Sequence, residues 1–245
     1  MRFREHLQSI PYIGVTITWA IIGIFIVIYN QIAIRFFYLK SYILALFPVS
    51  IFIMLLLIRK KKKFNIKCLK WANYITIFTF TFLFMTSLVD IFWNECTKEI
   101  TNISEYNKIL KIQGYPNKEL KHFPKKIPKE VSNVEFYEIP QFLQGGEEVR
   151  LSYITNEEEI KNTIDKYKTL SYKVIEDYKG GNGTELGVWI NHYVDENMKE
   201  GHTKVFIIDS KPYKPNEVHQ WNHGYSYGIA VNEENKKIVY WYEKW

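Results

Sequence analysis

Cysteine is nearly absent from the 245-residue sequence, which contains only Cys68 and Cys96. The two residues lie on either side of an apolar run at positions 74–93. If this run crosses a membrane, the two thiols cannot pair, because a disulfide requires α carbons within about 7 Å of each other. We therefore expect the later part of the chain to be stable through burial of its Tyr, Trp, Ile and Val side chains alone.

Acidic side chains are scarce in the first 95 residues, which hold 3 of them against 11 basic ones. The rest of the chain holds 23 acidic and 21 basic side chains. The basic pI of about 9.0 therefore comes from the first part. A nucleic-acid-binding domain needs a cationic surface of its own, so we expect no nucleic-acid partner.

Charged side chains, apart from Asp90, are missing from three long apolar stretches of the first part, at positions 11–32, 41–58 and 74–93. Each stretch approaches or exceeds the ~18–20 residues that cross a ~30 Å hydrocarbon layer. In lipid the backbone must be paired within each segment, so we expect three helices. Trp71, Tyr74 and Trp93 bracket the third stretch, as interfacial anchors do. Residues 1–95 are thus predicted to be a membrane anchor of three transmembrane helices in a lipid bilayer.

Basic residues between the second and third stretches indicate the orientation of the chain. Residues 59–63 read Arg-Lys-Lys-Lys-Lys, and two further lysines follow before position 71. With Arg2 and Arg4 they place nine cations on one face if all three stretches cross. The positive-inside rule then predicts a multi-pass protein of the cell membrane, with a cytoplasmic amino terminus and an extracellular domain at 96–245. No small-x-small cleavage site follows the first stretch, so we expect it to be retained.

The extracytoplasmic part is expected to be one α+β domain. Segments rich in β-branched and aromatic residues between turn residues predict strands. A hairpin is expected around Asn182-Gly183, which joins 171–178 to 184–193. The other expected strands are 133–139, 148–154, 204–209, 225–231 and 237–242. The pattern favours a mainly antiparallel sheet with one or two helices against a face.

Two helices are expected in this domain. The first begins near Asn102 and stops at Gly114, a residue that tolerates positive φ. The second begins at Thr155, which forms a capping box with Glu158. Between the helices, the two prolines of segment 122–129 predict an extended connector outside the core.

The segment from Gly224 to Gly228 matches the G-x-S-x-G pattern of a hydrolase nucleophile elbow. No histidine follows Ser226, and a strand is expected where the elbow requires a helix. We therefore assign no catalytic residue and interpret these glycines as relieving crowding in a Tyr-rich strand.

Four histidines fall close together late in the chain. Imidazole and carboxylate groups bind zinc, and catalytic zinc sites leave one position open for water. His192, His219 and His223 are the candidate metal ligands, although their spacing matches no zinc motif. Surface or hydrogen-bonded histidines are the favoured alternative, so we predict no cofactor and keep zinc as an open possibility.

Two features are candidate contact sites for a partner. One is the loop at positions 142–146, whose residues are Phe142, Leu143, Gln144, Gly145 and Gly146. The other is Trp245 at the aromatic carboxy terminus, because Trp and Tyr anchor many interfaces. The preceding Tyr240 and Tyr242 are expected to pack on the sheet.

Several short segments are similar to those of one bacterial group. His122-Phe-Pro-Lys-Lys-Ile-Pro128, Val134-Glu-Phe-Tyr137 and the 142–146 loop resemble a region of uncharacterised membrane-anchored or lipoprotein-like proteins of low-GC Gram-positive bacteria. The resemblance covers about residues 100–170. It implies an exposed bacterial domain and transfers no catalytic residue.

The leading hypothesis is a membrane-tethered binding or interaction module at the bacterial cell surface, without catalysis of its own and with a membrane or cell-surface protein as a possible partner. One alternative is an extracytoplasmic metal-dependent hydrolase that uses the late histidines. The other is an accessory subunit of a membrane transporter or sensor complex. Asp90 bears on this last alternative, because an acidic side chain within a span can mark a functional helix contact.

Overall fold

The computed structural model describes two compact units, Met1–Glu95 and Cys96–Trp245. Within the first, the structure describes residues 17–18, 21–25, 28–29, 35–36, 38–39, 43, 47, 50 and 66–95. Within the second, it describes residues 96–142, 146–179, 186, 188–198, 201–211 and 224–245.

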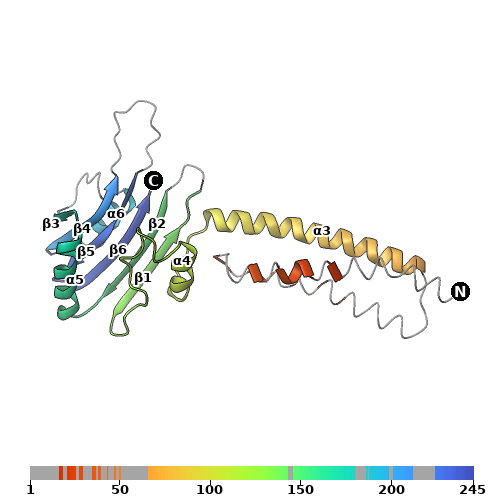
Figure 1. Ribbon diagram of the computed structural model, residues 1–245, viewed down its shortest axis with the longest axis horizontal. Coiled ribbons are helices and arrows are strands. Elements are labelled where there is room, and N and C mark those ends of the chain that lie inside the picture. Colours follow the sequence, from red (N-terminus) through yellow and green to blue (C-terminus); the bar gives the residue numbers. More distant parts are fainter. Residues whose placement is uncertain are drawn as a thin grey trace, which may run out of the picture. The chain divides into compact units, whose positions relative to one another are not determined.

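Helix α3, Ile66–Thr97, dominates the described part of the first unit (Figure 1). It contains the whole third apolar stretch, which is helical as expected despite its strand-like alternation at 75–82. The described residues at 17–18, 21–25 and 28–29 are helical as well. Within the described residues, no helix combines the length and the hydropathy needed to cross a membrane. Most of the second apolar stretch lies outside the described residues.

The second unit is built on a six-stranded sheet in the order β1-β2-β6-β5-β4-β3, and every neighbouring pair is antiparallel (Figure 1). The strands are β1 Ser132–Ile139, β2 Glu147–Ile154, β3 Lys173–Ile175, β4 Thr203–Lys211, β5 Tyr225–Asn232 and β6 Lys237–Lys244. The expected α+β class and antiparallel sheet are confirmed.

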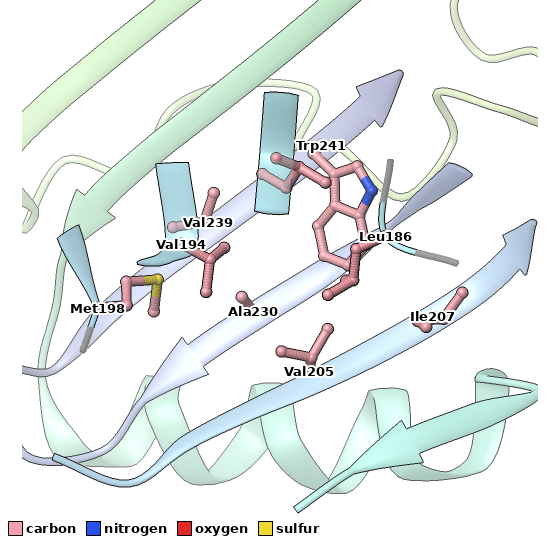
Figure 2. Close-up of a cluster of buried hydrophobic side chains, with 9 residues drawn as sticks. Leu186, Val194, Met198, Val205, Ile207, Ala230, Val239 and Trp241 are labelled. Carbon is pink, nitrogen blue, oxygen red and sulfur yellow. The ribbon is translucent and has the colours of Figure 1, made fainter. Parts of the chain in front are cut away.

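One face of the sheet is covered by α6, Val188–Asn197, over strands β4 to β6. Helix side chains four residues apart lie on one face, and here they pack on apolar strand residues two positions apart, such as Val239 and Trp241 of β6. Figure 2 shows the resulting cluster, with the Trp241 indole near Leu186. Its buried members are Leu186, Ile190, Val194, Met198, Val205, Ile207, Ala230, Val239 and Trp241.

The opposite face packs against α5, Glu157–Leu170, and the short helices η1, Ile103–Glu105, and α4, Tyr106–Ile112. Tyr240 on this face is buried beside Tyr153, as expected for alternating strand residues. Because strands β5 and β6 are buried on both faces, they are apolar almost throughout rather than alternating.

The start of each predicted helix is close to its expected place. Asn102 caps the first helix through its side chain, which accepts a hydrogen bond from the backbone of Ser104. For α5, the cap is Asn156 rather than Thr155, because the Asn156 side chain accepts from the Glu159 backbone at 2.8 Å.

Two sequence-based predictions in this unit are wrong. Segment 184–193, expected as a strand, contributes instead to α6, because Leu186, Ile190 and Val194 recur at helical spacing and all three are buried. The 122–129 segment is not purely a connector, because His122 and Phe123 are buried in the core. With α6 added, the described domain has three α-helices rather than one or two.

Candidate polar binding site

Helix α6 covers only part of its face of the sheet. Its apolar contacts lie on β4, β5 and β6, whereas the same face of β1 and β2 presents polar and aromatic side chains. The pairing of the strands locates this surface. Tyr137 of β1 lies opposite Arg150 of β2, and Arg150 lies opposite Trp241 of β6, which belongs to the core under α6. The polar half of the face therefore begins where the α6 core ends.

Arg150 is the centre of this polar surface. Its guanidinium carbon lies 3.7 Å from the centroid of the Tyr193 ring and 4.9 Å from that of Tyr137. Tyr193 comes from α6 and Tyr137 from β1, so two separate elements each bring an aromatic ring against the guanidinium. Such cation–π contacts fix a planar cation in one orientation. We name the surface formed by Glu135, Tyr137, Arg150, Ser152, Tyr193 and Lys237 the Arg150 platform.

A buried carboxylate, that of Glu148, forms an ion pair with Arg150. Nη1 of Arg150 donates to the Glu148 carboxylate at 2.6 Å, and only 2% of the Glu148 side chain is exposed. Burial raises the pKa of Glu148, and the charge of Arg150 opposes this shift. Glu243 lies directly opposite Glu148 on β6 and is also buried. Its carboxylate accepts from the backbone N–H of Ile190 in the first turn of α6, so both carboxylates have structural partners.

A second network forms the other side of the platform. The Tyr193 hydroxyl donates to Glu135 at 2.6 Å, and the Ser152 hydroxyl donates to the same carboxylate at 3.0 Å. Nζ of Lys237 lies 3.5 Å from Glu135. Partial burial acts to raise the pKa of Glu135, but the Tyr193 hydrogen bond and the Lys237 charge outweigh it and lower this pKa. Glu135 is thus ionised at neutral pH while its side chain stays 60% exposed.

The arrangement is suited to binding a polar ligand. Among the described residues, Nη1 is the only nitrogen of Arg150 that donates to another side chain, and five N–H donors are available on a guanidinium. The exposed Glu135 carboxylate supplies acceptors beside these donors. Rigid rings and charged groups held by neighbouring structure are typical of preorganised binding sites.

The predicted contact residues Phe142, Gly146 and Trp245 lie at one end of the sheet. Glu147, which follows Gly146, pairs with Lys244, which precedes Trp245. Trp245 donates its backbone N–H to Gly224, and its indole packs so closely there that a β carbon on Gly224 would overlap it. Trp245 therefore has a structural role. The other members of the predicted loop, Leu143, Gln144 and Gly145, lie outside the described residues, so the proposed contact stays a prediction.

The predicted zinc ligands are described only in part. His192 is an exposed residue of α6 whose Nε2 lies 3.3 Å from Glu196, one helical turn away. His219 and His223 lie outside the described residues. Within the parts of the chain that are described, no three His, Cys, Asp or Glu side chains are grouped as metal ligands.

Ser226, the serine of the G-x-S-x-G segment, is buried within strand β5. Its hydroxyl accepts a hydrogen bond from the Trp241 indole at 3.3 Å. Gly228 lies under the Trp241 ring, where a β carbon would overlap both that ring and the Phe206 carbonyl oxygen. The structure thus agrees with the interpretation that glycine relieves crowding in this strand.

The Arg150 platform is not among the sites predicted from the sequence, although one signal for it exists. Arg150 is the only arginine in residues 96–245, in a segment that otherwise uses lysine for its positive charges. Arginine, unlike lysine, stacks between rings and forms planar hydrogen bonds, so a lone arginine among lysines suggests a site that needs this geometry. The tyrosines that surround it come from distant positions and could not be assigned to it without the fold.

Comparison of the chain with family models, with curated proteins and with solved structures yields no match.

Proposed function

We propose that this protein is a membrane-tethered binding module, in which residues 1–95 anchor the chain and the α+β domain binds a ligand or partner on the extracytoplasmic side. The Arg150 platform is the binding surface. The charge distribution of the sequence supports the orientation, because the basic cluster at 59–63 precedes α3 and the domain follows it.

Exposed apolar side chains support a lipid environment for the first unit. Among the described residues, 18 of the 21 large hydrophobic side chains that are exposed belong to it. On α3 they include Phe78, which is 75% exposed, Val89, which is 68% exposed, and the terminal pair Trp71 and Trp93. An apolar surface of this extent is unusual on a protein surrounded by water and typical of one that contacts membrane or partner helices.

Contacts at the carboxyl end of α3 support alternating crossings. The carboxylate of Glu95 accepts backbone hydrogen bonds from Arg35 at 2.8 Å and from Phe36 at 3.1 Å. The Arg35 guanidinium donates to the Glu95 carbonyl oxygen at 2.8 Å. Residues 35–36 follow the first apolar stretch, and Glu95 follows the third. Three successive crossings would put these two points on the same side of a membrane.

The single observation that favours binding is the contact of the Arg150 guanidinium with the rings of both Tyr137 and Tyr193. Arg and Tyr are enriched among the residues that dominate interface energies. Here Arg150 is paired with the buried Glu148 carboxylate, and the residues Tyr137, Arg150 and Tyr193 remain partly accessible to solvent. This geometry is what a preorganised recognition surface requires.

A photocrosslinking experiment on whole cells tests this proposal. Tyr137 is replaced by benzoylphenylalanine in the full-length chain, which keeps an aromatic ring on the platform. We expect a discrete crosslinked species that disappears when Arg150→Lys is added. The matched control places the same group at Tyr172, which is 57% exposed. Tyr172 directly precedes β3, the edge strand at the opposite end of the sheet from β1. The same species from Tyr172, or none from Tyr137, would contradict a binding role for the platform.

The accessory-subunit alternative shares the anchor and differs in what the spans contribute. If the spans only tether the domain, replacing residues 1–95 by an unrelated membrane anchor of the same orientation should leave the Tyr137 crosslink intact. Loss of the crosslink from a correctly folded and oriented chimera would favour a subunit whose helices contact a partner.

A further inference from the structure

We infer that the Arg150 platform recognises a glycan, a ligand with many hydroxyl groups and little net charge. This inference rests on the proposed function and specifies the chemical class of its ligand. It follows from the charge balance of the platform, from its arrangement of donors and acceptors, and from the state of the neighbouring sheet edge.

Charge balance on the platform disfavours strongly charged ligands. Arg150 and Lys237 supply two positive charges, and Glu135 and Glu148 supply two negative charges within 3.5 Å of them. Glu99 adds a further carboxylate near the Tyr137 hydroxyl, where it helps burial to raise the pKa of Tyr137 to about 12. The exposed carboxylates of Glu135 and Glu99 would repel a polyanion, and the charges of Arg150 and Lys237 would repel a polycation. A neutral polar ligand meets neither penalty.

The platform places donors and acceptors side by side. Glu135 lies opposite Ser152, and Tyr137 lies opposite Arg150, on adjacent strands. Neighbouring strands are about 4.8 Å apart, and residues two positions apart on a strand are about 7 Å apart. Ser152 is fully buried, so the accessible groups are Glu135 and the partly buried Tyr137 and Arg150, which are spaced on the scale of a single sugar ring. A sugar hydroxyl both donates and accepts, so it can use Glu135 and Arg150 at the same time.

Tyr137 supplies an aromatic surface for the same ligand. Arg150 covers one face of its ring, and the described residues make no other ring contact with it. The residue is only partly buried. The C–H faces of pyranose rings pack on aromatic faces, so an accessible tyrosine beside planar polar side chains fits a glycan better than it fits a hydrocarbon chain.

A peptide bound by strand addition is the main competitor, and the β1 edge disfavours it. Ile100 already exchanges both backbone hydrogen bonds with Glu138 on that edge, at 2.8 and 2.9 Å. The backbone N–H and C=O of Phe136 point towards the same outer edge of β1 as those of Glu138, because the two residues are two positions apart. Phe136 is only 3% exposed. An incoming strand would therefore find the centre of this edge covered.

Titration of the full-length protein in lipid nanodiscs with chitotetraose and with maltotetraose tests the inference. We expect one of these neutral glycans to bind, and both Arg150→Lys and Glu135→Gln to weaken binding by about tenfold or more, the effect of losing a charged hydrogen-bond partner. Tyr172→Leu is the control and should leave binding unchanged. Glu135 is exposed, so its variant keeps the test valid if Arg150→Lys fails to fold.

The two proposals fail in different ways. Binding of neither glycan by folded wild-type protein, binding of inorganic polyphosphate instead, or binding that survives both platform substitutions would overturn the glycan assignment. If the Tyr137 crosslink then contains a peptide, the proposed binding function stands with a protein partner. If no crosslink forms either, both proposals are wrong.

Discussion

Nε2 of His122 lies 2.9 Å from the backbone carbonyl oxygen of Trp241, although the two residues are 119 positions apart. A carbonyl oxygen only accepts hydrogen bonds, so the neutral imidazole carries its proton on Nε2. The ring also stacks on Tyr227, with centroids 5.6 Å apart. This contact ties the segment after α4 to the centre of the sheet.

The burial of His122 predicts acid sensitivity of the fold. Desolvation lowers its pKa to about 3, against about 6.5 in an unfolded chain. The neutral form therefore stabilises the fold above pH 6.5, and this contribution is lost as the pH falls towards 3, at roughly 1.4 kcal/mol per pH unit. His122→Gln should be less stable at pH 7 and should lose less stability between pH 6.5 and 4. Denaturation followed by tryptophan fluorescence measures both. Equal pH slopes in the two proteins would contradict this account.

The cap of α5 provides a test with adjacent residues. The Asn156 side chain accepts from the Glu159 backbone, so Asn156→Ala should lower the free energy of unfolding by about 1 kcal/mol. The sequence pattern favoured Thr155, but the structure gives it no capping bond, and Thr155→Ala should cost much less. Urea denaturation of both variants measures the difference. A larger loss for Thr155→Ala would show that the helix begins one residue earlier.

Gly228→Ala should be among the most destabilising small substitutions in the domain. A β carbon there would overlap the carbonyl oxygen of Phe206 and the ring of Trp241 within the packed core. We expect a loss of about 3 kcal/mol or more. At Gly224 the nearest atoms to an added β carbon belong to the Trp245 side chain, which can shift more readily than the backbone carbonyl met at Gly228, so the loss should be smaller. Similar melting temperatures for the two variants would contradict this packing.

The Glu148–Arg150 pair predicts a non-additive mutant cycle. Arg150→Met leaves a buried carboxylate without its partner and should destabilise the domain by about 3 kcal/mol at pH 7. Adding Glu148→Gln should recover more than half of this loss. Because burial already raises the pKa of Glu148 and Arg150 opposes that rise, the single Arg150→Met variant should be less impaired at pH 5, where Glu148 takes up a proton more readily. Additive effects of the two substitutions would show that they do not interact.

Most of the sheet could be predicted from the sequence, because β1, β2, β4, β5 and β6 carry β-branched and aromatic residues between clear turn signals. The failure at α6 has a local cause. Val188, Trp189, Ile190, Tyr193 and Val194 favour a strand by composition, and only the spacing of the buried residues indicates a helix. Tertiary packing against β4 to β6 outweighed local preference there.

The burial of His122 and the Arg150 platform could not be predicted, because both depend on contacts between distant segments. Prolines and lysines surround His122 in the sequence, a composition typical of an exposed connector. The residue is nevertheless buried, because its ring packs against those of Tyr227 and Tyr240. The platform needs Tyr193 of α6 beside Arg150 of β2. Since the α6 segment was predicted to be a strand, Tyr193 had no expected position near Arg150.

The two native cysteines allow the most direct test of the proposed topology, in which residues 74–93 cross the membrane and the basic cluster lies in the cytoplasm. Cys68 and Cys96 lie near opposite ends of α3, about 42 Å apart along a helix. Cys96 is a partly buried free thiol, so Lys125→Cys in a chain lacking both native cysteines serves as an exposed reporter of the same side. A membrane-impermeant maleimide added to intact cells should label the Lys125→Cys chain and the Cys96-only chain, and should label the Cys68-only chain only after the cells are opened. Labelling of Cys68 in intact cells, with the reporter protected, would contradict the account.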